Sequence, residues 1–190
     1  MRSEEAVYVL DATPIIHFAK VNRINLVLGI CKAYMTKEVY KETVERGQGR
    51  ADSLTIRDAL ERREMEVYDV RNTEMLRFLQ RHAEMHLGEA ETLAATKELD
   101  AFAVIDEAEA RAVAKTYDIK TRAGTLFLLF KLLALGKIRV TEAEGMLDEL
   151  VASGLYIDSR TLIKAKHRIK SMGIWQQRSH HYRIRRQASK

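Results

Sequence analysis

The 190-residue sequence has little of what marks several classes of protein. It contains one cysteine, Cys31, and one proline, Pro14, beside nine glycines. A single cysteine excludes an internal disulfide framework and fits a reducing compartment, and so few prolines and glycines exclude collagen-like and linker-like chains. No apolar run reaches the 18 residues or so of a membrane-spanning helix. The acidic start, residues 1–5, also lacks the basic stretch of a signal peptide. We therefore expect a soluble, cytoplasmic protein without membrane contact.

Acidic residues are absent from the last part of the chain. All 27 acids lie at or before Asp158, so residues 1–158 carry a net charge of −5. Residues 159–190 contain ten bases and carry +10. The formal net charge of +5 thus combines an acidic body with a basic tail. With 46% hydrophobic residues, the body has enough apolar side chains to bury a core.

Short apolar runs alternate with segments of helical spacing. The runs 6–10 and 101–105 show no polar alternation, which predicts strands covered on both faces, as in a parallel sheet. Strands are also predicted at 33–35, 65–68 and 118–120. Strands that alternate with helices predict an α/β fold with a parallel sheet.

Capping residues and glycines place the ends of the predicted helices. Thr13 and Pro14 predict a helix whose cap is the threonine and whose first residue is the proline. Gly88 is expected to precede a helix over 89–99. One further helix is predicted to start at Thr36. The others are predicted over 52–62, from Asn72 towards His82, from Asp106 to about 115, from Gly124 to Gly136, over 141–153 and over 158–171. The last of these merges into the basic tail.

Two of the predicted strands end on an acidic residue. Asp11 follows the first run, Asp106 follows the run 101–105, and Glu107 comes next. Each acid also opens a helix, where the macrodipole favours negative charge, so capping alone explains any one of them. Adjacent ends of parallel strands would, however, bring the carboxylates together where such sheets bind ligands. Because such a cluster is costly without a cation, the pattern favours Mg²⁺ or Mn²⁺.

Five short motifs, taken together, resemble the PIN-domain family. The resemblance covers residues 5–155. Within the family, the sequence is most similar to a prokaryotic, often archaeal branch. It implies a Rossmann-like, three-layer α/β/α sandwich with a central parallel sheet, with a nuclease domain over 1–155 and a C-terminal helix and basic tail over 156–190. The motifs are Asp11-Ala-Thr-Pro-Ile-Ile16, Glu42, Leu87-Gly-Glu-Ala-Glu-Thr-Leu-Ala94, Val104-Ile-Asp-Glu107 with Arg111, and Gly124-Thr-Leu126.

The resemblance to PIN domains implies a metal-dependent endoribonuclease that hydrolyses RNA with Mg²⁺ or Mn²⁺. Thr13 would orient the first acid through its hydroxyl, and Thr125, at a helix start, would contact a phosphate or a metal-bound water. Arg111 and the loop with Lys120 and Arg122 are expected near the site, where they could hold phosphates. Glu89 and Glu91 cannot share a helix face well, so which of them faces the site stays open. The implied ligands are Asp11, Glu42, Glu89 or Glu91, and Asp106 with Glu107; Asp11, Glu42, Glu89 and Asp106 are the implied catalytic set.

The basic tail favours contact with nucleic acid, because bases grip phosphates while Trp175 and Tyr182 can stack on nucleobases. A solvated extension, or a contact with a second subunit, is the alternative. Resemblance to VapC-type toxins also implies a homodimer and an antitoxin partner. The tail residues predicted to bind RNA are Arg178, Arg183, Arg185 and Arg186.

Other functions remain open on the residues alone. A PIN fold that docks RNA or a protein without catalysis is the main alternative. Phosphatase and receiver folds also end their first strand on an aspartate, but the haloacid-dehalogenase motif requires a second aspartate where Thr13 stands. His82 and His86 lack the glutamate that a zinc-protease motif places after its first histidine, so we expect them to be solvated or packed.

Overall fold

The chain forms two compact units, Met1–Leu128 and Leu129–Lys190. The structure is a computed structural model that describes residues 6–82 and 85–188, with the side chains of 6–81 and 85–173. Within these residues all the strands belong to the first unit.

The first unit is built on a single sheet of five parallel strands. The strand order is β3-β2-β1-β4-β5, and every neighbouring pair is parallel. Chain order reverses between β1 and β4, which is where open parallel sheets bind their ligands. The strands are β1 (Val7–Leu10), β2 (Lys32–Thr36), β3 (Met65–Tyr68), β4 (Phe102–Ile105) and β5 (Thr121–Ala123).

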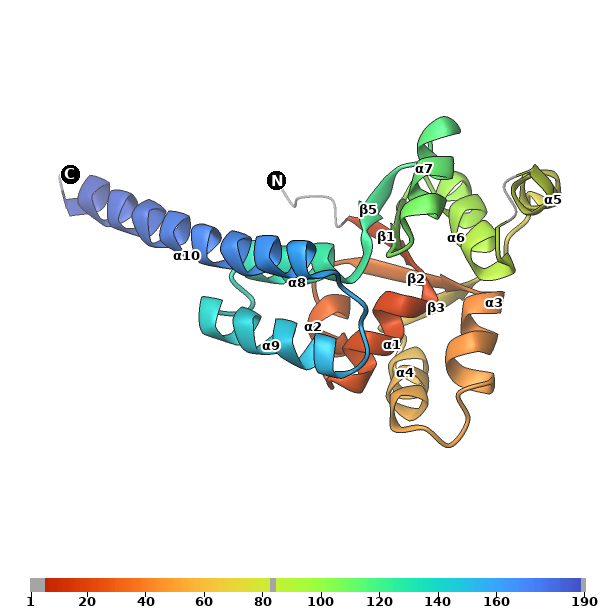
Figure 1. Cartoon of the computed structure of the whole chain (residues 1–190), viewed down its shortest axis with the longest axis horizontal. Helices are drawn as coiled ribbons and strands as arrows, with labels where there is room; N and C mark the ends of the chain where they lie inside the picture. Colours follow the sequence, from red (N-terminus) through yellow and green to blue (C-terminus); the bar gives the residue numbers. More distant parts are fainter. Residues whose placement is uncertain (1–5, 83–84, 189–190) are drawn as a thin grey trace. The chain divides into compact units, whose positions relative to one another are not determined.

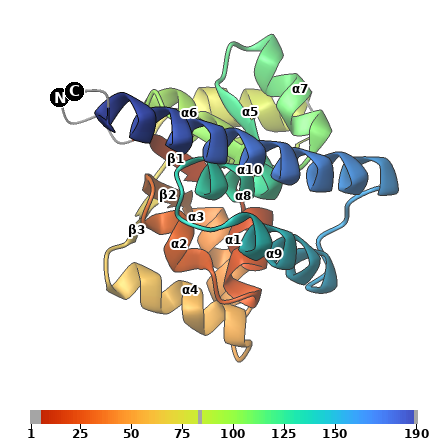
Figure 2. The same ribbon diagram turned by 90° about the vertical axis from the view of Figure 1, so that its left-hand side faces the viewer.

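Helices cover both faces of this sheet. Figures 1 and 2 show α5, α6 and α7 on one face and α1 to α4 on the other. The result is the three-layer α/β/α fold that the sequence predicted. The helices of this unit are α1 (Ala12–Lys20), α2 (Ile24–Leu28), α3 (Lys37–Tyr40) continued by the π-helical turn η1 (Lys41–Glu45), α4 (Ala51–Glu61), α5 (Thr73–His82), α6 (Leu87–Glu98), α7 (Ala108–Thr116) and the start of α8 (Gly124–Ala134).

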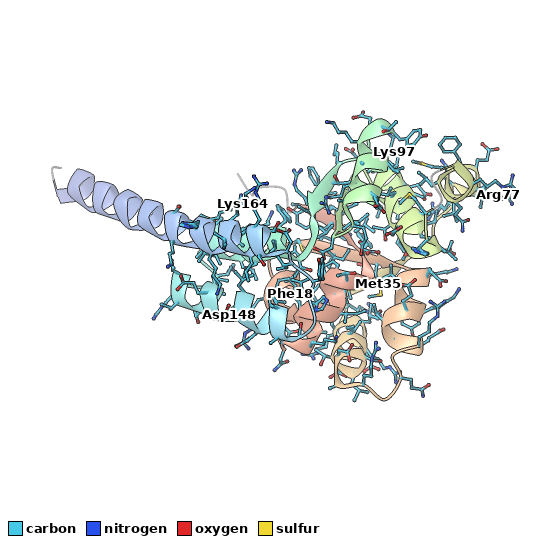
Figure 3. All side chains as sticks on the ribbon, viewed as in Figure 1. Phe18, Met35, Arg77, Lys97, Asp148 and Lys164 are labelled. Carbon is cyan, nitrogen blue, oxygen red and sulfur yellow. The ribbon has the colours of Figure 1, made fainter. Side chains whose placement is uncertain are left out.

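The side chains of β1 and β4 are largely buried on both faces, as the missing polar alternation predicted. Val9 packs with Ala95 of α6, and Ile105 packs with Leu93 of the same helix. Tyr8 points to the other face, where its ring meets Phe127 at 5.7 Å. Phe18 of α1 and Met35 of β2, labelled in Figure 3, have no exposed surface. Both layers are therefore anchored by apolar contacts.

The register brings three strand ends to one edge of the sheet. Leu10 lies opposite Val104, and the backbone N–H of Asp11 donates to the Val104 carbonyl at 3.1 Å. Ile105 lies opposite Ala123 at the next pair of strands. The residues that follow these strands thus start from the same edge.

The second unit contains the rest of α8 together with α9 (Val140–Ala152) and α10 (Ser159–Ala188). α9 packs on α10, where a Cβ on Gly173 would lie only 2.4 Å from a methyl of Val140. Lys166 and Asp148 form an ion pair at 2.9 Å between the same helices. None of the helices in the described ranges is long and apolar enough to cross a membrane. The domain boundary expected after residue 155 stays a prediction.

Two predicted helix starts are wrong. α1 begins at Ala12 with Asp11 as its N-cap, so Thr13 and Pro14 are its second and third residues. The extended backbone of Asp11, with ψ 170°, lets the helix begin directly after the strand. α6 begins at Leu87, so Gly88 lies inside its first turn.

The fifth strand and the last helix also differ from the prediction. β5 covers Thr121–Ala123 instead of 118–120. The reason is that Asp118, at φ +53°, and Ile119 close the end of α7, where the N–H of Ile119 donates to the Ala114 carbonyl at 2.9 Å. α10 continues through Ala188, so the basic run is helical instead of following the helix.

Candidate functional site

Asp11 is a buried acid at the carboxyl end of β1. It has 5% of its surface exposed. Its pKa is raised from 3.8 to about 8, first by burial and then by the charges of Glu107, Glu89 and Glu42, against a hydrogen bond from the Ala12 N–H. A carboxylate kept at such a cost marks a candidate functional site.

Glu89 and Glu107 stand at the N-termini of two helices beside Asp11. Glu107 is the N-cap of α7, and Glu89 accepts a hydrogen bond from the His86 N–H at 3.3 Å in the first turn of α6. Burial raises the pKa of Glu89, and the charge of Glu107 raises it further. Thr13, expected to orient Asp11, directs its hydroxyl towards Glu107 Oε1 at 3.5 Å.

Asp106 reaches the same edge but is held by the start of α8. Its carboxylate accepts the Thr125 N–H at 2.9 and 3.1 Å and the Thr125 hydroxyl at 2.6 Å. Leu10 lies opposite Val104, so Asp11 and Asp106 follow neighbouring strands at the same edge, with Asp106 one residue further along. The charge of Asp106 acts on His17, whereas the charges of Glu107, Glu89 and Glu42 act on Asp11.

Two glycines allow close approach to these acids. Gly124 has φ +48°, and a Cβ there would lie 2.0 Å from Asp106 Oδ1. A Cβ on Gly88 would lie 3.1 Å from Glu42 Oε1. Sequence reasoning interpreted both as markers of helix ends and missed this role. The signal that could have indicated this role is the position of each glycine directly before a motif residue, Glu89 after Gly88 and Thr125 after Gly124.

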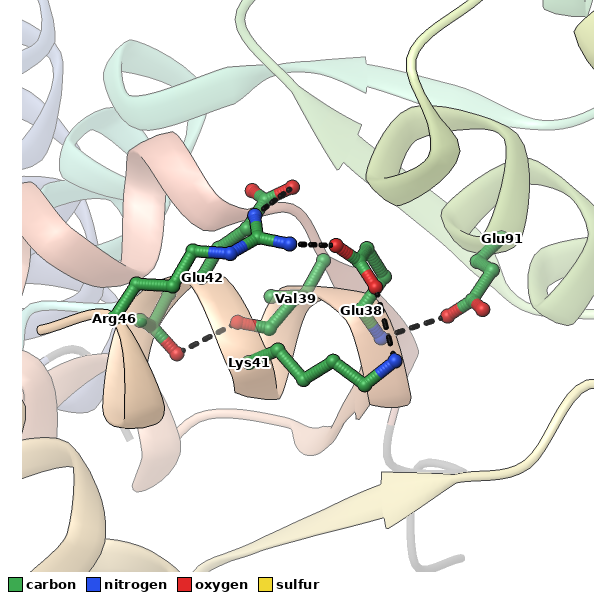
Figure 4. A network of polar contacts seen from close by, with 7 residues as sticks. Glu38, Val39, Lys41, Glu42, Arg46 and Glu91 are labelled. Atoms are coloured by element: carbon green, nitrogen blue, oxygen red, sulfur yellow. Dashed lines mark hydrogen bonds and ion pairs between the residues drawn. The ribbon is translucent and has the colours of Figure 1, made fainter.

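Glu42 lies on the π-helical turn η1 within a network of charges. Figure 4 shows the Arg46 guanidinium between the carboxylates of Glu42 and Glu38; Arg46 pairs with Glu42 at 3.7 Å and with Glu38 at 2.5 Å. Burial and the charge of Glu38 raise the pKa of Glu42, and Arg46 opposes them. Desolvation of Glu38 is outweighed by hydrogen bonds from Lys41 and Arg46, so its pKa lies below the usual value. π-Helical turns occur often at functional sites.

Glu91 has a different partner from Glu89. Its Oε2 accepts the backbone N–H of Glu38 at 2.9 Å, which ties α6 to the first turn of α3. Glu89 acts electrostatically on Asp11, whereas Glu91 acts on Glu42. The geometry therefore favours Glu89 as the acid that faces Asp11.

The acids do not form a closed ligand group. Within residues 6–81 and 85–173, no three or more His, Cys, Asp or Glu side chains are arranged to hold a metal ion. Like charges that act on one another also push one another apart. The donors are nevertheless carboxylate oxygens, the type that hard divalent cations prefer. The set fits such an ion chemically.

The remaining candidates have separate positions. Nη1 of Arg111 donates to the carbonyls of Ile105 at 2.9 Å and Asp106 at 2.5 Å, which ties α7 to the end of β4. His17 has 8% of its surface exposed; burial and then Lys20 lower its pKa, against the charge of Asp106. Side chains of His82 and of the tail residues Arg178, Arg183, Arg185 and Arg186 lie outside the described part of the chain, so their roles stay predictions.

A side chain at Gly124 is expected to disrupt the hold on Asp106. Gly124→Ala should lower the free energy of unfolding by about 2–4 kcal/mol, because left-handed strain adds to a clash. Gly136→Ala is the matched control, since Gly136 has φ +66° with no atom within 4 Å of its Cβ position. It should cost about 1 kcal/mol. Urea denaturation measures both, and equal losses would contradict the close-contact argument.

Asp11→Asn is expected to stabilise the chain at alkaline pH in EDTA. A carboxyl whose pKa is 3.8 unfolded and about 8 folded binds its proton more tightly when folded, so stability falls as pH rises from 4 to 8. Asparagine stays neutral. The variant should match the wild type near pH 4 and exceed it by on the order of 4 kcal/mol at pH 8. Denaturation at both pH values measures this.

The control is Asp58→Asn on α4, an exposed carboxylate that lies 3.9 Å from Arg62. Exposed pairs of this kind contribute little, so its stability difference from the wild type should not grow with pH. A wild type as stable as Asp11→Asn at pH 8 in EDTA would refute the electrostatic account of Asp11.

Comparison with known families bears on the identity of this site. The family model DUF3368, described as a PIN domain, matches residues 7–171. No curated protein matches the chain. The match includes all five strands and every acid of the site. PIN domains have a nuclease fold and typically use divalent metal ions. The strand order, the acids at the ends of β1 and β4, and this match together show that the chain belongs to the PIN-domain family.

Proposed function

We propose that the chain is a divalent-metal-dependent endoribonuclease that cleaves RNA at the carboxyl ends of β1 and β4. The observation that carries the proposal is the buried carboxylate of Asp11, placed at the strand end within the electrostatic reach of Glu42, Glu89 and Glu107. Burial of one carboxylate among three others favours a cation at this place.

Each acid has a role that follows from its position. Asp11, Glu42, Glu89 and Glu107 would hold the ion through oxygen atoms, and Asp106 would complete the set from the neighbouring strand end. Glu91, which accepts the Glu38 N–H, would hold α6 against α3, the helix that η1 continues with Glu42. A bound divalent ion would supply an activated water and neutralise charge on the phosphoryl oxygens.

Neighbouring residues keep these acids in place. Thr125 fixes the orientation of Asp106 through three hydrogen bonds. Arg46 holds Glu42 and Glu38 together, and Thr13 touches Glu107. The Mg²⁺ or Mn²⁺ assignment rests on a donor set made only of carboxylates, with neither cysteine nor histidine among them.

A role as the toxin of a toxin–antitoxin pair is a finer prediction that rests on the resemblance to VapC-type proteins. The same holds for the homodimer and for RNA contact by Arg178, Arg183, Arg185 and Arg186. A gene for a small DNA-binding protein directly upstream would support the toxin role. Its absence would leave the nuclease proposal unchanged.

The direct test is cleavage of a fluorogenic single-stranded RNA with Mn²⁺ or Mg²⁺. Asp11→Asn and Asp106→Asn should each lose activity by at least about 10²-fold, because loss of a ligand exceeds the roughly 10–100-fold effect of losing a supporting partner. EDTA should abolish cleavage, and added Mn²⁺ should restore it. Asp58→Asn, the exposed carboxylate of α4, should keep wild-type activity.

The outcomes separate the proposal from the main alternative. Activity that survives both aspartate substitutions would refute the site. RNA binding without cleavage under any divalent metal would instead indicate a non-catalytic binding module on the PIN fold. Metal binding detected by a rise in the melting temperature with Mn²⁺, absent in Asp11→Asn, would support the ligand assignment independently of turnover.

A further inference from the structure

A basic pocket lies between α7 and the edge strand β5 of the first unit. Its volume is about 400 Å³. Arg111 and Lys115 line it from α7, and Lys120, Thr121 and Ala123 line it from β5 and the residue before it. Arg111 and Lys115 are four residues apart and therefore lie on one face of the helix. Asp118 is the one acid among the lining residues, so the pocket carries a net positive charge.

The three cations of this pocket are available to a ligand to different degrees. Lys115 is exposed and has no ion-pair or hydrogen-bond partner for its side chain in the part of the chain that the structure describes. Lys120 pairs with Asp100 at 2.6 Å, but both side chains are about half exposed or more, and such pairs are weak. Arg111 uses only Nη1 for its two backbone contacts, and a guanidinium has five N–H donors.

The pocket joins the acidic site through the backbone of two strands. Ala123, at one end of the pocket, is followed by Gly124 and Thr125, which hold Asp106. Arg111, on the opposite wall, binds the carbonyls of Ile105 and Asp106. Lys120 lies three residues before Ala123, roughly 10 Å away along an extended strand. An RNA strand that extends from the acids along β5 would therefore run close to the cations that line the pocket.

We propose that this pocket binds a backbone phosphate of the RNA strand other than the phosphate that is cleaved. The proposal rests on the proposed function, since it takes the strand to run from the acidic edge along β5. Lys115 is the main contact, because its charge has no internal partner. Arg111 and Lys120 add donors on either side, and Asp118 sets one limit on how closely an anion approaches.

The chemistry of the lining favours a phosphate over a nucleobase or an apolar ligand. Ammonium and guanidinium groups are the phosphate-binding side chains of proteins. No aromatic ring lines the pocket, and stacking on aromatic rings is how single-stranded bases are usually held. An internal phosphate, a terminal phosphate and inorganic phosphate share this chemistry, and the experiment distinguishes them.

The test measures binding of a labelled single-stranded RNA to the full chain by fluorescence anisotropy, with Ca²⁺ in place of Mg²⁺ or Mn²⁺. Lys115→Ala should raise the Kd by about 3–10-fold at low salt and lower the slope of log K against log salt by about 0.7, the contribution of one phosphate contact. Lys115→Arg should stay close to the wild type. Arg77→Ala, which removes one exposed charge from α5 (Figure 3), is the control and should change neither value.

A second series identifies the phosphate. RNAs with one neutral methylphosphonate each should bind the wild type less tightly when the substitution falls at one internal position near the cleaved bond. The Lys115→Ala variant should bind this substituted RNA as tightly as it binds the unsubstituted RNA. An effect only on removal of a terminal phosphate, or equal competition by inorganic phosphate, would overturn the backbone assignment.

Failure of this inference and failure of the proposed function give different results. Equal Kd values for wild type and Lys115→Ala, with RNA cleavage intact, would refute the pocket and leave the nuclease. Dependence of RNA binding on Lys115 without cleavage under any metal would refute the nuclease and keep the phosphate site. A smaller loss for Lys115→Ala than for Arg77→Ala would also refute the pocket.

Discussion

Repulsion between carboxylates at one edge of the sheet is the constraint on which the rest of the site depends. The fold offsets it in part with helix N-termini: Asp11 caps α1, Glu107 caps α7, Glu89 lies in the first turn of α6, and Asp106 accepts the Thr125 N–H at the start of α8. Each such placement is worth about 0.3–1 kcal/mol. The shift in the pKa of Asp11 from 3.8 to about 8, caused first by burial and then by the neighbouring carboxylates, corresponds to on the order of 5 kcal/mol. Because the dipoles offset only part of that cost, the remaining charge favours a cation.

The part of the fold and of the site that could be predicted is the part that the hydrophobic pattern of the sequence specifies. A strand buried on both faces and ending on an acid is visible at Leu10–Asp11 and at Ile105–Asp106, and the parallel α/β fold follows from the alternation of elements. The offset of one residue between the two aspartates was not predictable, because it depends on a register in which Leu10 faces Val104. A shift by one residue reverses the face of a strand side chain, and no single-strand pattern specifies pairing to that accuracy.

Contacts that depend on tertiary approach were also missed. Gly124 was interpreted as a helix start, yet its missing Cβ makes room for Asp106. Arg46 attracted no prediction, although its guanidinium pairs with Glu38 of α3 and with Glu42 of η1. β5 was predicted three residues too early. Asp118 adopts φ +53° and closes the end of α7, and the sequence alone does not distinguish an aspartate in such a turn from one at the start of a strand. Gly124 meets a partner that is distant in sequence, whereas the contacts of Arg46 and Asp118 are local and depend on a backbone conformation that composition does not reveal.

The basic side chains of the first unit differ in what they already contact, and these contacts determine which of them can bind a polyanion. Arg46 is committed to two carboxylates and Arg111 in part to two carbonyls, whereas Lys115 has its whole charge available. At physiological ionic strength exposed charges are screened beyond about 8 Å. A cation of the first unit therefore acts on a bound strand mainly at the phosphates close to its own side chain. Under the proposed function, Lys115 would thus act on the lifetime of a bound strand through one phosphate contact. The rate of association depends instead on long-range charge and falls steeply with salt.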